Sequence, residues 1–300
     1  MGHPLVHRLP ADGVSLRSVL RHLRLFSLSL AIAAAASHAS ARPLDEVVAS
    51  KLLRVVVYRD NPPFSWMDGG QPRGIDVDIG RALAQNLGVE VEIMTRMTAE
   101  DVDDDLRFNI WKGPHSEGGV GDVMLHVPVD RDLMARNNLA VISNAYFMQT
   151  VALAIDPDRL AAPTSFDTFT EAKIGVQYST VADYFLLRFG DGKLINNVVH
   201  HTKLEKGIDE FLKKDTAAIL GVRSNIEGML NQKGGKATFV DVPMPGLARR
   251  SWLIGTAVKD NSRDLGYAIG AAFEKMQTSG DLQKIFSTYG VTYVSPDTPD

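Results

Sequence analysis

The sequence contains no cysteine among its 300 residues. Disulfide bridges, thiolate metal sites and thiol nucleophiles are therefore excluded. No run of apolar residues reaches the roughly 18 that are needed to span a membrane. The chain also lacks a basic segment, and its formal net charge is −4. It therefore has no electrostatic footprint of a nucleic-acid-binding protein.

The common catalytic signatures are missing as well. We find no G-x-S-x-G nucleophile elbow, no H-E-x-x-H zinc motif and no P-loop. His200 and His201 are adjacent, so their side chains diverge and do not form a shared metal site. The sequence thus predicts a protein that is not an enzyme and that uses no metal or cofactor.

The N-terminal segment has the order of a secretory signal. Four arginines precede an apolar run at residues 25–36, and the small residues Ala39, Ser40 and Ala41 follow it. A positive segment, an apolar core and an A-x-A site are typical of a cleaved signal peptide. We expect cleavage of residues 1–41 near Ala41 and localisation in the periplasm. The alternative is an amphipathic helix at the start of a cytosolic domain.

A strand followed by aromatic residues opens the remaining chain. The apolar residues Leu53, Val55, Val56 and Val57 predict a short strand. Pro62 and Pro63 have no N–H group for a sheet, so the chain must leave the strand there. Phe64 and Trp66 follow, which places two aromatic rings at the carboxyl end of the strand. Ligands are received at this end of the strands in open α/β sheets.

An amphipathic helix comes next, beginning near Asp76. Ile79, Leu83 and Leu87 recur at helical spacing, and Gly88 is the predicted stop. The order of a strand, Pro-Pro-Phe-Ser-Trp, a Gly-Gly turn, Gly-Ile-Asp-Val-Asp-Ile and a helix ending in Asn-Leu-Gly resembles the opening of the family 3 extracytoplasmic solute-binding proteins. That family contains the periplasmic amino-acid receptors of ABC importers.

The resemblance covers the chain after the signal and implies a bilobal, type II periplasmic-binding-protein-like fold. Its two mixed-sheet α/β lobes would be joined by a two-segment hinge, and the alternation of strands and helices independently favours the α/β class. We expect residues 42–150 and 256–292 to form lobe 1 and residues 151–255 to form lobe 2. Residues 293–300 are predicted to be a disordered tail.

The candidate ligand-binding residues follow the strands that would face each other across the hinge. In lobe 1 they are Tyr58, Asp60, Phe64, Trp66, His126 and Arg131. In lobe 2 they are Gln177, Tyr178, Ser179, Thr180 and Arg223.

Aromatic rings and a helix N-terminus suggest how a ligand would be held. Phe64 and Trp66 offer flat faces for stacking, although either ring could instead pack in the core of its own lobe. Ser179 and Thr180 precede a helix whose free N–H groups favour an anion, and ordinary capping by Ser179 is the other interpretation. Arg131 is either a carboxylate clamp or a surface residue paired with neighbouring aspartates.

The resemblance also shows a departure in the amino-acid site. Relatives place an aspartate for the α-amino group after the strand that corresponds to residues 217–220, but this chain has Gly221, Val222 and Arg223 there. A buried ammonium without its partner costs several kcal/mol. The sequence therefore predicts a small polar or anionic organic ligand that is not a standard α-amino acid.

Two functions remain in different classes. The first is a monomeric receptor that delivers its ligand to the membrane subunits of an ABC importer. The second is an accessory protein of a PQQ-dependent quinoprotein dehydrogenase, because residues 103–128 are similar to the methanol-oxidation J-type branch of the same fold. A few members of this fold are dehydratases, so a catalytic role for this chain, with Asp60 or Asp130 as the base, is a further alternative.

Overall fold

The computed structural model describes residues 1–2, 41–114 and 118–297. The chain divides into two units, Met1–Ala39 and Ser40–Asp300, and all the helices and strands given below lie in the second unit. The predicted signal peptide falls almost entirely outside the described residues. No helix in the described part is long and apolar enough to cross a membrane.

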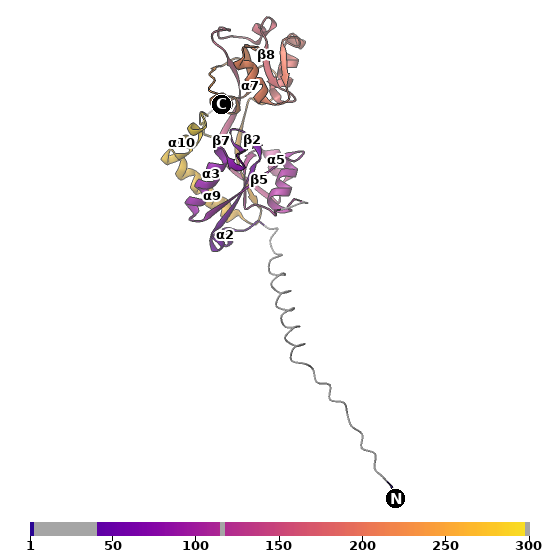
Figure 1. Cartoon of the computed structure of the whole chain (residues 1–300), viewed down its shortest axis with the longest axis vertical. Coiled ribbons are helices and arrows are strands. Elements are labelled where there is room, and N and C mark those ends of the chain that lie inside the picture. Colours follow the sequence, from indigo (N-terminus) through magenta and orange to yellow (C-terminus); the bar gives the residue numbers. More distant parts are fainter. Residues whose placement is uncertain (3–40, 115–117, 298–300) are drawn as a thin grey trace. The chain divides into compact units, whose positions relative to one another are not determined.

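The described elements form two lobes (Figure 1). The first lobe contains α2 (Leu44–Ser50), β1 (Leu52–Tyr58), β2 (Asp60–Asn61), β3 (Ser65–Asp68), β4 (Gln71–Arg73), α3 (Ile75–Leu87), β5 (Glu90–Arg96), α4 (Val102–Leu106), η1 (Arg107–Trp111), β6 (Val123–Pro128), α5 (Arg131–Arg136), the first part of β7 (Ala140–Ile155), β12 (Ser251–Lys259), α9 (Arg263–Ser279) and α10 (Asp281–Thr288). The second lobe contains the end of β7, η2 (Phe166–Thr170), β8 (Ile174–Gln177), α6 (Val181–Arg188), η3 (Phe189–Gly192), β9 (Val198–His201), α7 (Leu204–Leu212), β10 (Ala218–Val222), α8 (Arg223–Gln232) and β11 (Thr238–Val240).

The strands of both lobes join through β7. Their order is β5-β1-β6-β12-β7-β10-β8-β9, and β11 pairs with β7. β1 runs parallel to β5 and β6, whereas β12 runs antiparallel to β6 and β7, so the sheet is mixed. β7 pairs with β12 along its first part and with β10 and β11 along its last part. The predicted α/β class with a bilobal, mixed-sheet fold is confirmed.

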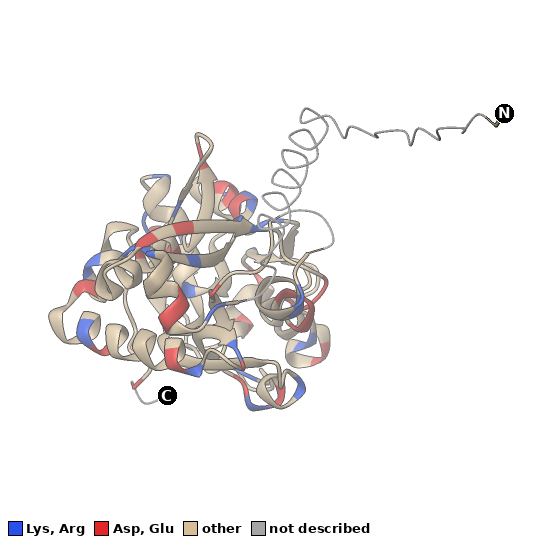
Figure 2. Cartoon of the chain, turned by 90° about the horizontal axis from the view of Figure 1, so that it is seen from below, with Lys and Arg blue, Asp and Glu red and all other residues tan. Residues whose placement is uncertain are grey.

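Basic and acidic residues alternate over the surface helices rather than collecting on one side (Figure 2). Many of them form local pairs, such as Arg81 with Asp78 at 2.7 Å and Lys284 with Asp281 at 3.0 Å. Exposed pairs of this kind contribute little to stability because water and salt screen them. The fold therefore depends on its apolar cores.

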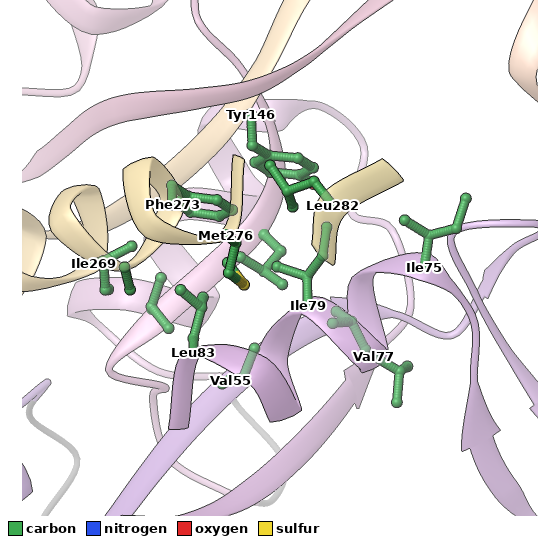
Figure 3. Packing of buried hydrophobic residues seen from close by; sticks show 14 of the residues in the cluster. Val55, Ile75, Val77, Ile79, Leu83, Tyr146, Ile269, Phe273, Met276 and Leu282 are labelled. Atoms are coloured by element: carbon green, nitrogen blue, oxygen red, sulfur yellow. The ribbon is translucent and has the colours of Figure 1, made fainter. Parts of the chain in front are cut away.

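The core of the first lobe follows directly from the predicted helix. Ile75, Ile79 and Leu83 of α3 share one face and have no exposed surface. They pack against Val55 of β1 and the apolar face of α9 and α10 (Figure 3). The helix ends at Gly88, which has φ = 69° and donates its N–H to the carbonyl groups of the last turn, as the sequence predicts.

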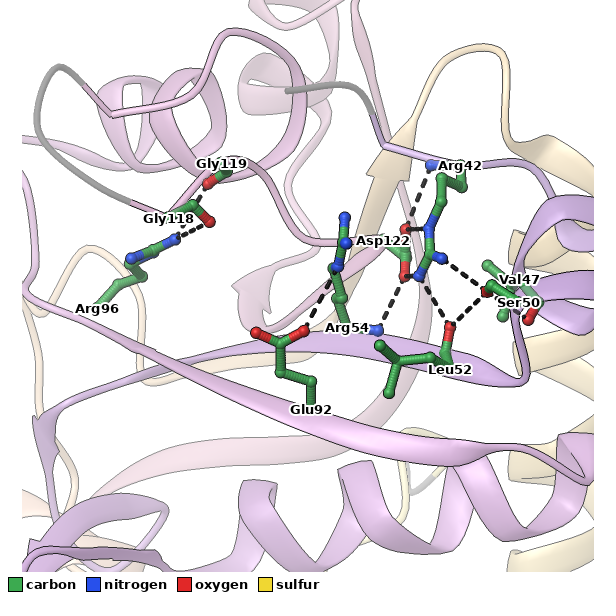
Figure 4. A network of polar contacts seen from close by, with 10 residues as sticks. All are labelled: Arg42, Val47, Ser50, Leu52, Arg54, Glu92, Arg96, Gly118, Gly119 and Asp122. Carbon is green, nitrogen blue, oxygen red and sulfur yellow. Dashed lines mark hydrogen bonds and ion pairs between the residues drawn. The ribbon is translucent and has the colours of Figure 1, made fainter. Parts of the chain in front are cut away.

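A buried ion pair between Arg42 and Asp122 attaches the segment before α2 to the core of the first lobe. The carboxylate of Asp122 has no exposed surface and accepts bonds from Arg42 Nε at 3.0 Å and Arg42 Nη2 at 2.6 Å (Figure 4). The backbone N–H of Arg54 in β1 donates to the same carboxylate at 2.8 Å. Arg42 also donates to Ser50 Oγ and to the carbonyl oxygen of Leu52. Asp122 thus joins the chain before α2 to the central strands.

The end of the chain differs from its prediction. Tyr293 lies against Phe286 with ring centroids 5.1 Å apart, and Val294 accepts a backbone bond from Met148 at 3.1 Å. The structure therefore places these residues on the first lobe, although the sequence predicts a disordered tail from residue 293. Tyr293, an aromatic residue in a mostly polar segment, is the sequence feature that could have indicated this packing.

Candidate functional site

A cleft of about 460 Å³ lies between residues of the two lobes. Loops after β1 and the strands β6 and β7 form one wall, and the ends of β8, β9 and β10 with α6, α7 and α8 form the other. Its polar lining consists of Asp60, Asn61, His126, Gln149, Gln177, Thr180, Thr202, Lys203, Glu205 and Asn225. The carboxyl ends of β8 and β10 both open into this space, as expected for an α/β ligand site.

Four of the predicted residues line the cleft, namely Asp60, His126, Gln177 and Thr180. Asp60 is paired with Lys203 of the other lobe, with an O–N distance of 3.0 Å. Both side chains are exposed, so this pair is weak and can exchange with a ligand. The structure therefore brings predicted residues of both lobes to one space.

Two predicted residues lie behind the cleft wall. Phe64 has no exposed surface, and its ring centroid is 4.3 Å from that of His126. Tyr58 is buried and donates its hydroxyl to Asp105 at 2.7 Å, and burial raises the pKa of Tyr58 above its usual value. In this structure Phe64 offers no surface for stacking on a ligand. It supports the histidine from inside the lobe.

Three further predicted residues lie away from the cleft. Trp66 packs edge-on against Tyr289, with ring centroids 5.8 Å apart. Arg131 is exposed at the start of α5, where Asp130 is paired with Arg249 rather than with its neighbour. Arg223 turns outwards from the cleft.

The contacts of Arg223 explain its direction. Its guanidinium lies 4.8 Å from the centroid of the Phe239 ring and 2.8 Å from Glu227. Gly221 and Val222, which precede it, do line the cleft. Among the described residues that line the cleft there is no arginine. A bidentate guanidinium clamp for a carboxylate is therefore missing from this conformation.

The predicted anion site at the start of α6 is already occupied by an acidic side chain. The backbone N–H of Ser179 donates to Asp183 Oδ2 at 2.7 Å. Thr180, rather than Ser179, is the N-cap, because its hydroxyl accepts from the N–H of Asp183 at 3.3 Å. Ser179 has φ = 62°, and Tyr178 is 64% exposed beside His200. A carboxylate at this helix tip disfavours a second anion.

Several cleft residues were missed by the sequence analysis. Lys203 and Asn225 belong to the second lobe but contact the first, since Asn225 donates to the carbonyl oxygen of Pro62 at 3.0 Å. Such pairings between distant segments leave no local pattern. Gln149 did leave one, because it is a single amide within the otherwise apolar and hydroxyl-bearing run 145–155.

A buried polar network reaches the cleft at His126. Its Nδ1 lies 3.0 Å from Oδ2 of Asp76, a carboxylate with no exposed surface. The other oxygen of Asp76 accepts the hydroxyl of Tyr146 at 2.7 Å. On the opposite side of the ring, Gln149 lies 3.5 Å from Nε2 and accepts the indole N–H of Trp252 at 2.8 Å.

The described residues contain no group of three His, Asp or Glu side chains placed to hold a metal ion. The cleft lining combines hydrogen-bonding groups with apolar side chains. Pro62, Val151, Leu204 and Met229 supply the apolar part of the lining.

Comparisons with known proteins agree with this architecture. Residues 53–108 match the family model of the bacterial extracellular solute-binding proteins, family 3. A comparison with the curated proteins gave no match. The family match covers β1 to α4 and includes residues 53–88, which carry the resemblance in the sequence.

Solved structures resemble the whole fold. An ancestral cationic amino acid solute-binding protein has a TM-score of 0.66 and 20% identity, and the match covers 82% of this chain and 99% of that one. An ancestral amino acid-binding protein described as a precursor of cyclohexadienyl dehydratase gives 0.55 and 19%, covering 82% and 98%. An amino acid ABC transporter substrate-binding protein from Streptococcus pneumoniae, bound to L-arginine, gives 0.56 and 17%, covering 85% and 100%. None of these three names refers to a quinoprotein dehydrogenase. The chain has the bilobal fold of periplasmic solute-binding proteins.

Proposed function

We propose that this chain is a family 3 solute-binding protein that captures a small polar ligand in the cleft between its lobes and delivers it to an ABC importer. The observation that carries the proposal is the meeting of polar groups from both lobes across one cleft, with Asp60 and His126 on one side and Gln177 and Thr180 on the other. A ligand that touches both walls favours the closed arrangement of the lobes, which is the usual signal in such receptors.

The cleft lining supports a ligand other than a standard α-amino acid. Such a ligand needs a carboxylate clamp and a partner for its ammonium group. Arg131 and Arg223 face away from the cleft, and Gly221 and Val222 provide no carboxylate at the end of β10. The charged groups of the lining lie elsewhere, and two of them, Asp60 and Lys203, are paired with each other. The carboxylate of Asp183 at the α6 tip further weakens the case for an anion there. The sequence predicts a polar or an anionic ligand, and of these two we therefore favour the polar one.

The remaining parts of the proposal concern the context of the protein. We propose export to the periplasm with cleavage near Ala41, a monomeric mature chain, and lobe bounds at residues 150 and 256. The accessory role beside a quinoprotein dehydrogenase has no supporting observation in the fold or in the comparisons. Binding without chemical change is the function that we propose for the cleft.

A thermal-shift screen of the mature chain tests this function. The panel should contain amino acids, polyols, diamines, amides and dicarboxylates. A ligand at one hundred times its Kd stabilises the folded state by about 2.7 kcal/mol. For a chain of this size, that corresponds to a rise in Tm of roughly 5–11 °C. We expect at least one compound class to give such a shift.

A variant that fills the cleft provides the control. A Cβ atom at Gly221 would meet nothing closer than Ile226 Cδ1 at 3.6 Å, so this cleft-lining position admits a side chain, and we expect the ring of G221F to fill the cleft. A248F adds the same ring at a hollow outside the cleft. The Tm shift should disappear in G221F and persist in A248F. A screen with no shift, or shifts that G221F retains, would contradict binding in this cleft.

A further inference from the structure

A chain of hydrogen bonds with a fixed direction ends at the cleft. Trp252 and Gln149 are opposite each other in the β12–β7 ladder, and the indole N–H donates to Gln149 Oε1 at 2.8 Å. An indole nitrogen can only donate, so the amide of Gln149 must present its oxygen to Trp252. Its NH₂ group therefore points towards Nε2 of His126.

This orientation determines the protonation of the histidine. Because Gln149 offers a donor to Nε2, that nitrogen must carry a lone pair. The ring proton must then be on Nδ1, where it is donated to Asp76 Oδ2 at 3.0 Å. Both neighbours of the ring thus favour the same neutral tautomer, and the 3.0 Å bond to Asp76 is the stronger of the two contacts.

Asp76 is held as an acceptor by its own surroundings. It has no exposed surface and lies in the first turn of α3, a helix of 13 residues whose dipole favours a negative charge at that end. The hydroxyl of Tyr146 donates to Oδ1 at 2.7 Å. Burial and the neighbouring Asp76 raise the pKa of Tyr146 well above its usual value, so its hydroxyl stays a donor.

The histidine ring is also held in place by packing. Phe64 lies beneath it at 4.3 Å between centroids, and Tyr58 contacts its edge at 6.4 Å. The backbone of His126 has φ = 62°, a left-handed conformation that non-glycine residues rarely adopt. Such conformations persist only where the surrounding structure determines them, and they concentrate at functional sites.

The lone pair on Nε2 is only weakly used within the protein. Its distance of 3.5 Å to Gln149 is longer than the usual 2.7–3.2 Å of a strong N–H donor bond. His126 is 8% exposed and lines the cleft together with Gln149, so the cleft reaches the side of the lobe where the ring lies. Lys203, the one lysine or arginine among the described residues that line the cleft, is engaged by Asp60.

We propose that His126 Nε2 is a fixed hydrogen-bond acceptor that selects ligands carrying a hydroxyl, amine or amide N–H group at this point of the cleft. Deprotonated carboxylates without such a donor are rejected there, because two acceptors would face each other. The ligand class rests on the proposed receptor function, whereas the relay from Trp252 through Gln149 to His126 does not. Gln149 and Trp252 are positioning residues that act through His126.

Nitrogen-15 NMR of histidine-labelled mature protein tests the relay without any ligand. The wild-type spectrum should show His126 protonated at Nδ1 and unprotonated at Nε2. Q149E replaces the donor that faces Nε2 by an acceptor, so Nε2 should become protonated. W252F removes the indole donor and frees the amide to turn its oxygen towards Nε2, so Nε2 should become partly protonated while Asp76 keeps the proton on Nδ1.

W66F is the matched control, because Trp66 is a partly buried tryptophan outside the relay. It should leave the His126 signals unchanged, and dispersed amide spectra will show that each variant is folded. A wild-type ring protonated at Nε2, or a tautomer indifferent to Q149E and W252F, would overturn the relay.

The ligand class is tested with three four-carbon compounds, namely 1,4-butanediol, 1,4-diaminobutane and succinate. A diol or diamine should shift the His126 Nε2 signal, and succinate should not.

Binding of succinate with a shift at Nε2 would overturn the proposed class and leave the receptor function standing. If none of the three moves the signal while a donor-free anion binds in the thermal-shift screen, the class is also overturned. If nothing in the screen binds, the receptor function fails together with the class that rests on it, and the relay is decided by the tautomer measurement.

Discussion

Replacing Asp122 by alanine should lower the free energy of unfolding by roughly 3–5 kcal/mol, the usual cost of removing one partner from a buried ion pair. The substitution leaves Arg42 buried with its charge uncompensated, since its Nε and Nη2 both donate to this carboxylate. It also removes the acceptor of the Arg54 N–H in the central strand β1. No other acidic side chain is within bonding distance of Arg42 among the described residues.

Urea unfolding of the mature wild type and D122A, followed by circular dichroism, measures the effect. The control is D68A, because Asp68 forms a comparable pair with Arg73 at 3.0 Å in which both side chains are exposed. D68A should unfold at the wild-type urea concentration. A stability of D122A equal to that of D68A would show that Arg42 finds water or another partner, and that the ion pair does not hold the N-terminal segment.

The fold could be predicted because its signals are local. Leu53, Val55, Val56 and Val57 put apolar residues on both faces, which is typical of a buried parallel strand, and Ile79 and Leu83 recur at helical spacing before Gly88. These patterns are written within one element and need no knowledge of its neighbours. The same is true of the alternation of strands and helices that gave the two lobes.

The direction of single side chains could not be predicted in the same way. The position of Phe64 after two prolines indicates that the chain turns, but not to which side the ring points. Its burial follows from contacts with Phe147 and Phe286, which are distant in sequence. Arg223 likewise turns outwards because Phe239 and Glu227 lie there.

Two members of the polar network could have been identified from the sequence as polar residues at positions where the pattern predicts apolar ones. Asp76 lies within the motif that carries the family resemblance, and a carboxylate on the apolar side of a helix requires partners. Gln149 interrupts an apolar strand in the same manner. The sequence marks both residues as buried polar groups, but only the tertiary structure joins them through His126.

The substitution G228A should have the second large effect, because it disturbs the contact between the two lobes. α8 of the second lobe packs on the first lobe at Pro63, and a Cβ atom at Gly228 would lie 2.5 Å from Cβ and Cγ of that rigid ring. Glu227 beside it accepts from the backbone N–H of Thr292 at 2.8 Å. G228A must therefore separate α8 from Pro63 and disfavour the arrangement of lobes in this structure.

Overpacking of this kind costs about 1–3 kcal/mol. If the ligand binds this arrangement, its Kd should rise roughly 5- to 150-fold, measured by calorimetry with the compound that gives the largest thermal shift. Small-angle X-ray scattering of the ligand-free variant should show a larger radius of gyration than the wild type.

The matched control is G266A in α9, where an added Cβ would meet only Val258 Cγ2 at an ordinary 3.4 Å. Since alanine favours a helix interior by about 1 kcal/mol over glycine, G266A should retain or gain stability and bind as the wild type does. An unchanged Kd and radius in G228A would mean that the α8–Pro63 contact does not limit opening of the cleft. A larger radius with an unchanged Kd would place ligand recognition on one lobe alone, because only a ligand held by both walls is sensitive to their separation.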